Sequence, residues 1–311
     1  MAARGGGVRV TRILLIGAGG QVGFELRRTL SPLGLLTALD RRDVDLANAD
    51  ALRACVRAER YDLIVNAAAF TAVDRAEQEP EVARAINAEA PAILAEAAVR
   101  AQAVLVHFST DYVFDGRARR PYVEEDVPNP LGVYGRTKLE GDRAIEASGA
   151  DHLIFRTSWV YGNRGRNFLL TILRLARERP ELKVVDDQLG APTWSRMIAE
   201  ATAAVLAQCR FGARRIGRDM AEVGGLYNLA AGGQTSWAGF AASIVERAGA
   251  SPGAPRPRVS PIPTSEYPLP AARPAYSVLS QEKLDRVFGV RLPEWAQSLE
   301  DCFTERASGL A

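Results

Sequence analysis

A tyrosine and a lysine stand four residues apart in the segment YGRTK, as Tyr134 and Lys138. In a helix this spacing puts both side chains on one face. A lysine ammonium beside a phenol favours the phenolate, so it lowers the tyrosine pKa and permits proton transfer near neutral pH. Such pairs are also common on helix surfaces, so the spacing alone does not establish a catalytic site.

Two hydroxyl side chains, Ser109 and Thr110, come shortly before this pair and are followed by Asp111. They end the run 103–110, which has the composition of a buried strand. A hydroxyl at the end of a strand can hydrogen-bond a substrate carbonyl and orient it. Together with the Tyr–Lys pair, this predicts protonation of a carbonyl oxygen.

A glycine-rich turn predicts a dinucleotide site near the N-terminus. Gly17, Gly20 and Gly23 follow the apolar run 13–17 and open an amphipathic stretch that begins at Gln21. A pyrophosphate needs a tight turn, close backbone approach and helix N–H groups aimed at it, and glycine permits all three. The alternative is a purely structural turn in another α/β protein.

The end of the next apolar run carries opposite signals for the choice of cofactor. Asp40 could accept hydrogen bonds from the adenosine ribose, which favours NADH. Arg41 and Arg42 follow directly and could pair with a 2′-phosphate, which favours NADPH. Both cofactors are therefore plausible, although the two arginines could instead belong to a solvated loop.

The elements that must position these residues alternate along the first half of the chain. Apolar runs at 13–17, 35–40, 61–69 and 103–110 are separated by helical patterns, among them 48–59 and 81–101. Runs of this kind predict a doubly wound, Rossmann-type parallel sheet covered by helices on both faces. The ligand crevice is then expected at the carboxyl ends of the strands.

Composition excludes several other classes of protein. A net charge of +2 over 311 residues gives no sign of a nucleic-acid partner, and no apolar run is long enough to span a membrane. Three scattered cysteines do not predict a disulfide framework, and two histidines leave little room for a metal cluster or a Ser-His-Asp triad. Without a signal-peptide pattern, a cytoplasmic enzyme is expected.

The second half of the chain is less regular and predicts a smaller, discontinuous substrate-binding lobe. Segment 210–226 resembles a surface loop, and 251–275 is rich in proline, which excludes regular helix and central strand. We expect the dinucleotide-binding domain to span 12–160, with 182–208 returning to it. The lobe then comprises 161–181 and 209–311.

Several motifs in order along the chain carry a family resemblance: GAGGQVG, NAAAFTAVDRAE, HFSTDYVFDG, PNPLGVYGRTKLEGD, FRTSWVYG, DDQLGAPT, YNLAAGGQTSW and RPAYSVLSQEKL. The chain resembles the dTDP-4-dehydrorhamnose reductase family of extended short-chain dehydrogenases. The resemblance implies NADPH- or NADH-dependent reduction of a dTDP-linked 4-keto sugar, dTDP-4-dehydro-β-L-rhamnose, in the synthesis of dTDP-rhamnose for cell-wall polysaccharide. Another nucleotide-sugar reductase or epimerase, or a regulatory subunit like that of methionine adenosyltransferase, shares this fold.

The resemblance also implies residue roles. Thr110, Tyr134 and Lys138 would form the catalytic triad, with Thr110 where many short-chain dehydrogenases have serine. Residues of the glycine turn and the next strand ends would bind the cofactor together with Tyr134 and Lys138: Gly17, Gly20, Gln21, Val22, Gly23, Asp40, Arg41, Asp45, Leu46, Ala67, Ala68 and Ala69. Candidates for contact with the sugar nucleotide are Thr71, Val73, Tyr112, Trp159, Asn167 and Arg273.

Several of these candidates have simpler explanations. Trp159 could be core, Asn167 could cap a helix, Arg273 could lie on the surface, and His107 is expected to serve packing.

The sequence departs from one property implied by the resemblance. Some members of the family are described as Mg²⁺-dependent, with acidic residues forming a bridged dimer. Glu25 suits an acidic position, but Arg196 stands where a second acid would help, and a cation opposes Mg²⁺ binding. We therefore predict no metal site and a monomer or homodimer.

Overall fold

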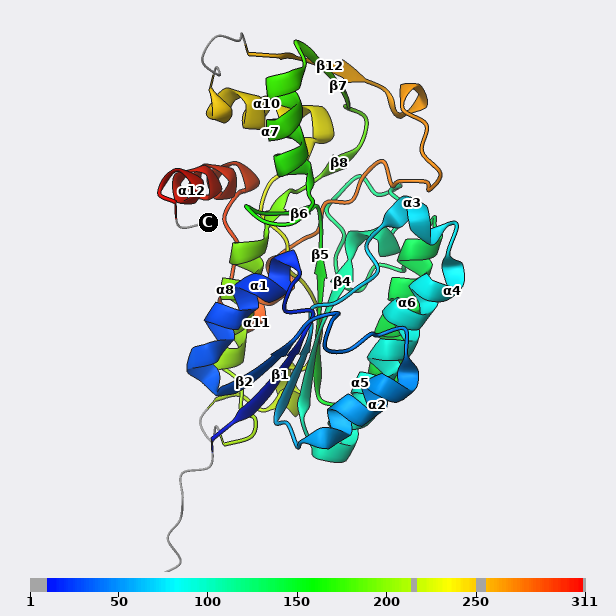
Figure 1. The fold of residues 1–311 in the computed structure, drawn as a ribbon, viewed down its shortest axis with the longest axis vertical. Helices are drawn as coiled ribbons and strands as arrows, with labels where there is room; N and C mark the ends of the chain where they lie inside the picture. The colour runs from blue at the N-terminus through cyan, green and yellow to red at the C-terminus, as the bar shows by residue number, and fades with distance from the viewer. Residues whose placement is uncertain (1–9, 214–216, 250–255, 310–311) are drawn as a thin grey trace, which may run out of the picture.

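The computed structural model describes residues 10–213, 217–249 and 256–309. Its centre is a six-stranded sheet in the order β10-β5-β4-β3-β1-β2, and all neighbouring strands run parallel (Figure 1). The strands are β1 (Arg12–Ile16), β2 (Leu35–Leu39), β3 (Leu63–Asn66), β4 (Val104–Thr110), β5 (His152–Thr157) and β10 (Gly225–Asn228). This confirms the predicted doubly wound α/β fold.

Helices cover both faces of the sheet, which explains why the central strands are apolar along their whole length. The side chains of β3 and β4 are buried throughout. One face packs against α1 (Gln21–Leu30), α8 (Ser195–Ala207) and α11 (Glu282–Phe288). The other packs against α2 (Ala49–Ala58), α5 (Ala90–Ala101) and α6 (Val133–Ala147) (Figure 1).

A smaller lobe lies beyond the carboxyl ends of the strands (Figure 1). Its core joins α7 (Phe168–Glu178), α10 (Trp237–Ala248) and α12 (Trp295–Ala307). Three short two-stranded sheets complete it: β7 (Glu181–Val185) with β12 (Arg258–Ile262), β6 (Val160–Tyr161) with β9 (Thr193–Trp194), and β8 (Leu189–Gly190) with β11 (Thr235–Ser236).

Short helical turns connect these elements. They are α3 (Val73–Ala76), α4 (Pro80–Arg84), a π-helical turn (Ala85–Glu89), α9 (Met220–Val223) and three 3₁₀ turns (Ser31–Leu33, Asp111–Val113 and Thr264–Glu266). The predicted helix 81–101 is therefore interrupted by the π-helical turn. Across the described ranges, the structure contains no helix that combines the length and apolar character needed to cross a membrane.

The segments that belong to the main sheet and to the small lobe differ from those predicted. β10 and α11 lie on the main sheet, although 209–311 was assigned to the lobe, because β10 supplies the strand beside β5. β7 belongs to the lobe, although 182–208 was expected to return to the sheet, because β12 pairs with it. The predicted loop 210–226 contains Phe211, Met220 and Val223, which are buried in the core beneath the sheet.

Candidate active site

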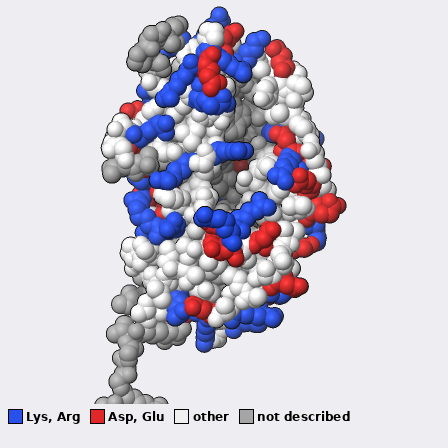
Figure 2. Space-filling model, viewed as in Figure 1, with Lys and Arg blue, Asp and Glu red and all other residues white. Residues whose placement is uncertain are grey.

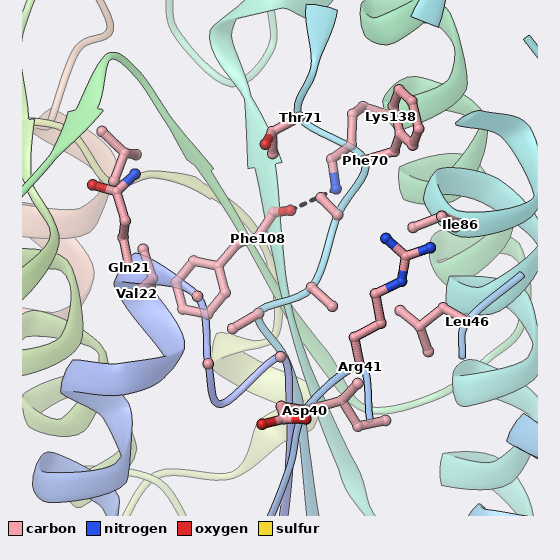
Figure 3. A pocket seen from close by; sticks show the side chains of 18 of the residues that line it. Gln21, Val22, Asp40, Arg41, Leu46, Phe70, Thr71, Ile86, Phe108 and Lys138 are labelled. Carbon is pink, nitrogen blue, oxygen red and sulfur yellow. Dashed lines mark hydrogen bonds between the residues drawn. The ribbon is translucent and has the colours of Figure 1, made fainter. Parts of the chain in front are cut away.

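A cavity of about 600 Å³ opens at the carboxyl ends of the central strands. Its walls come from the β1–α1 turn, the ends of β2, β3 and β4, and the start of α6. Figure 2 shows basic side chains gathered around the hollow on this face, and Figure 3 shows the interior. This is the place where open parallel sheets bind their ligands.

The glycine turn allows the backbone to pack closely at the floor of this cavity. Gly17 has a φ of +85°, and a Cβ there would lie 2.6 Å from the Ala68 nitrogen. A Cβ on Gly23 would lie 2.0 Å from the Gly17 oxygen, so the first turn of α1 can rest directly on the loop. The turn thus has the shape that a pyrophosphate requires at a helix N-terminus.

The two arginines after β2 have different environments. Arg42 forms an ion pair with Asp40, with 2.6 Å between Nη2 and Oδ2, and this hydrogen bond lowers the Asp40 pKa to about 2. Both arginines line the cavity, and Figure 3 shows the Arg41 guanidinium pointing into it. Arg41 is therefore the arginine placed to meet an anionic group inside the cavity.

A buried asparagine fixes the loop after β3, which forms one wall of the cavity. Asn87, in the π-helical turn, accepts a hydrogen bond from the Phe70 nitrogen at 2.8 Å and donates to the Phe70 oxygen at 3.1 Å. It also donates to Thr137 on α6 at 3.2 Å. The π-turn thus fixes the loop after β3 relative to the helix that carries Tyr134 and Lys138.

Tyr134 and Lys138 lie on one face of α6 and both line the cavity, as their spacing predicts. Lys138 is 1% exposed, and its Nζ donates to the Phe108 oxygen at 2.6 Å (Figure 3) and lies 2.9 Å from His107 Nε2. Burial lowers the Lys138 pKa to about 8. The amine is therefore held firmly and titrates near the physiological range.

Burial raises the Tyr134 pKa to about 12, aided by the charges of Asp111 and Asp142. This differs from the expectation that Lys138 lowers it. The Lys138 amine is directed at Phe108 and His107, and its own charge is disfavoured by the same enclosure, so it does not offset the effect of burial on the Tyr134 pKa. The phenol is thus a proton donor in this state.

Thr110 lies between the phenol and a buried carboxyl group. Its hydroxyl lies 3.1 Å from Asp111 Oδ1, to which it donates when that carboxyl is ionised, and it accepts from the Tyr112 nitrogen at 3.1 Å. Thr110 also acts on Tyr134, because its side chain lowers the pKa of the phenol and so opposes part of the effect of burial. Burial raises the Asp111 pKa to about 7.

Comparison with known proteins gives these features a family. A family model described as the RmlD substrate binding domain matches residues 11–308. A dTDP-4-dehydrorhamnose reductase from Burkholderia thailandensis is 48% identical over 300 residues, which covers 96% of this chain and 99% of that protein.

Solved structures agree. A reductase of the same name from Clostridium acetobutylicum matches with a TM-score of 0.85 and 36% identity over 94% of this chain and 99% of its own. One from Bacillus anthracis, solved in complex with NADP, gives a TM-score of 0.85 and 33% identity over 95% and 99%. The chain belongs to the dTDP-4-dehydrorhamnose reductase family.

Most cofactor residues implied by the dTDP-4-dehydrorhamnose reductase resemblance meet in the one cavity. Those lining it are Gly17, Gly20, Gln21, Val22, Asp40, Arg41, Asp45, Leu46, Ala67, Ala68, Ala69, Tyr134 and Lys138, together with the substrate candidate Thr71. Gly23 and the catalytic candidate Thr110 are not among the lining residues. Several lining residues were not predicted from the sequence: Ile16, Gly19, Val44, Phe70, Ile86, Phe108, Thr157 and Val160. A signal existed for those that adjoin predicted site residues, such as Gly19, Phe70 and Val160, but none existed for Ile86, which lies in the π-helical turn.

The remaining substrate candidates of this reductase lie outside the cavity lining and have partners of their own. Trp159, with a φ of +46°, stacks on Trp237 at 3.5 Å between ring centroids. Asn167 caps α7 through the Leu170 nitrogen and donates to Gln21 at 2.8 Å. Arg273 pairs with Asp74, and Tyr112 packs edge-on against Tyr134, while Val73 begins α3.

An arginine occupies the position considered for Mg²⁺. Arg196 Nε lies 3.5 Å from Glu25 Oε2, and its guanidinium also pairs with Glu305. Within the ranges that the structure describes, no group of three or more His, Cys, Asp or Glu side chains is arranged to hold a metal ion. The absence of a metal remains a prediction.

Proposed function

We propose that this chain reduces the C4 ketone of dTDP-4-dehydro-β-L-rhamnose to dTDP-L-rhamnose, with NADPH or NADH as the reductant. The observation that carries the proposal is that Tyr134 and Lys138 meet a dinucleotide-type glycine turn in one cavity. The relative from Burkholderia thailandensis, a dTDP-4-dehydrorhamnose reductase that is 48% identical, supports the sugar substrate. The NADP-bound relative supports the cofactor.

The residues present fit a nicotinamide dinucleotide. The close approach of Gly17, Ala68 and Gly23 leaves no room for side chains where a pyrophosphate would lie. Asp40 and Arg41 would hold the adenosine ribose, and the loop 67–69 would line the nicotinamide half. When bound, the reduced nicotinamide supplies a hydride to C4 of the sugar.

The chain's own residues supply the proton and hold the reacting oxygen. Tyr134 donates its phenolic proton to the oxygen on C4 as negative charge develops there. Thr110 donates a hydrogen bond to the same oxygen, which requires its hydroxyl proton to turn from Asp111. Lys138 holds the nicotinamide ribose and, as an ammonium, stabilises the phenolate that Tyr134 becomes.

The sugar nucleotide would lie between the sheet and the small lobe. Arg273 would contact the diphosphate and Tyr112 the sugar region, while Thr71 and Val73 would lie along the entrance. Trp159 would present the edge of its stack with Trp237 to the sugar. Asn167 would act through Gln21, because its side-chain amide already caps α7 and contacts Gln21.

Oxidation of NADPH with dTDP-4-dehydro-β-L-rhamnose tests the proposal. We expect one NADPH consumed for each sugar reduced, and much slower turnover of the un-epimerised 4-keto-6-deoxyglucose nucleotide. An epimerase would recycle its cofactor without net consumption, and a regulatory subunit would show no turnover with either sugar. Either result would refute the proposal.

A further inference from the structure

His107 is buried against the candidate catalytic lysine. It lies on β4, is 1% exposed, and places Nε2 at 2.9 Å from Lys138 Nζ. The same Nζ donates to the Phe108 oxygen at 2.6 Å. Two groups of β4, the His107 ring and the Phe108 carbonyl, therefore hydrogen-bond the lysine nitrogen directly.

The other nitrogen of the ring contacts an asparagine that also hydrogen-bonds the cavity wall. Asn66, at the end of β3, has Nδ2 at 3.1 Å from His107 Nδ1. Its Oδ1 accepts from the Ala68 nitrogen at 3.2 Å, and Ala68 lines the cavity. A continuous chain of hydrogen bonds thus connects the cavity wall, Asn66, His107 and Lys138.

A neutral imidazole carries one proton, so the direction of its hydrogen bond with Asn66 determines the direction of its hydrogen bond with Lys138. When Asn66 donates to Nδ1, the proton resides on Nε2 and points at Lys138, which must accept as a neutral amine. An ammonium cannot accept, so it donates to Nε2. The ring proton must then be on Nδ1, and Asn66 must turn its amide to accept it, which gives up the hydrogen bond from the Ala68 nitrogen.

We propose that His107 is a positioning residue for Lys138 whose ring tautomer changes with the charge of the lysine, with Asn66 as the complementary partner. This inference rests on the proposed function of Lys138 in the reductase reaction. One proton leaves to solvent when the ammonium becomes an amine, and the imidazole keeps a single proton in a new position. His107 can therefore hydrogen-bond the lysine in both charge states.

Burial, more than the neighbouring charges, makes the lysine rather than the ring the group that titrates. Asp142 on α6 lies 3.9 Å from His107 Nε2 and is paired with Ser109 at 2.6 Å. Arg156 on β5 lies 3.8 Å from Asp142, and Tyr134 lies on the same helix as Lys138. Burial and the Lys138 charge keep the His107 pKa well below its usual range, while the Lys138 pKa is about 8.

Nitrogen NMR of the full-length protein, labelled with ¹⁵N in histidine side chains, tests the inference directly. The chain has only two histidines, so His152→Gln assigns the signals and serves as the matched control. Between about pH 6 and about pH 10 we expect His107 to stay neutral and to pass from the Nδ1–H to the Nε2–H form as the lysine deprotonates. A single tautomer throughout, or an imidazolium, would overturn the proposal.

Two variants separate coupling from simple packing. In Lys138→Met the tautomer should no longer change with pH, because the titrating partner is gone. His107→Phe should lower kcat roughly tenfold and shift its pH profile, with NADPH affinity little changed, whereas His107→Gln, whose amide can accept or donate, should recover most of the loss.

Failure of this inference and failure of the proposed function give different results. A tautomer change in a protein that lacks reductase turnover would preserve the coupling and refute the function. Normal turnover with a fixed tautomer would support the function and refute the coupling. Equal kcat in His107→Phe, His107→Gln and wild type would also remove His107 from the positioning of Lys138.

Discussion

Arg273 and Asp74 form a two-point ion pair, with 2.7 Å between Nη1 and Oδ1 and 2.6 Å between Nη2 and Oδ2. The pair joins the segment after β12 to α3 of the sheet domain, and the hydrogen bond from Arg273 lowers the Asp74 pKa. The Arg273 side chain is only 13% exposed. The guanidinium is thus oriented before any substrate binds, which reduces the entropy that a phosphate contact would cost.

Replacement of Arg273 by alanine should raise KM for the sugar nucleotide roughly tenfold or more, the size expected for a charged hydrogen bond. The diphosphate is remote from C4, so kcat should change less. The Kd for NADPH should stay nearly constant, because its pyrophosphate would lie on the glycine turn. Steady-state kinetics and a cofactor titration on one preparation measure these quantities.

Asp74→Asn is the matched control for Arg273. It removes the carboxylate charge but leaves the guanidinium and an amide oxygen that can still orient it, so sugar-nucleotide binding should be preserved or strengthened. If Arg273→Ala and Asp74→Asn raise KM equally, the pair only fastens the lobe to the sheet domain, and the diphosphate contact lies elsewhere.

Tyr134→Phe should lower kcat roughly a hundredfold or more, because it removes the general acid while the ring remains. Cofactor affinity should change little. Fluorescence titration with NADPH alongside the turnover assay separates the two effects. A variant with nearly normal kcat would exclude Tyr134 as the proton donor.

The two arginines after β2 should affect cofactor choice in different ways. Arg41→Ala should weaken NADPH more than NADH, and the difference should shrink as salt is added. Arg42→Ala should also weaken NADPH, but strengthen NADH, because it releases the Asp40 carboxylate for the ribose hydroxyls. Dissociation constants for both cofactors decide this, and an equal loss for both in Arg41→Ala would contradict it.

Asp111 should make stability depend on pH. Its folded pKa of about 7 lies above its ordinary value of 3.8, so the folded state retains the proton longer than the unfolded state. The stability it contributes is present below about pH 4 and is lost as the pH rises to about 7. Relative to Asp111→Asn, the wild type should lose about 3 kcal/mol between about pH 5 and about pH 8.

Urea unfolding of both proteins at the two pH values measures that loss. Parallel changes in wild type and Asp111→Asn would mean that Asp111 ionises normally in the folded protein. A variant destabilised equally at both pH values would indicate lost packing rather than relief of a buried charge.

Patterns of neighbouring residues in the sequence predicted those features of the fold that depend on apolar periodicity and on backbone geometry. The apolar strands, the turn at Gly17 and the shared helix face of Tyr134 and Lys138 follow from periodicity and from backbone geometry. The carboxyl ends of parallel strands then bring these residues together, as the cavity shows. No tertiary information was needed for that convergence.

Pairings between distant residues could not be predicted from such patterns. Asp74 had only the signal of an acid at the start of a helix, and nothing local connects it with Arg273. Asn87 interrupts an alanine-rich helix to reach Phe70, a contact that exists only once β3 and α6 are packed. The Lys138 pKa depends on burial in the packed protein, so the direction of its shift could not be deduced from the spacing to Tyr134.

The position of β10 has a consequence for synthesis of the chain. Its partner β5 is made long before residues 225–228 emerge from the ribosome, so β5 stays an open edge of the sheet in the interval. Its side chains are almost all buried in the finished fold, and an open apolar edge readily pairs with other chains. We expect nascent chains halted between residues 157 and 225 to be the most dependent on chaperones and the first to aggregate.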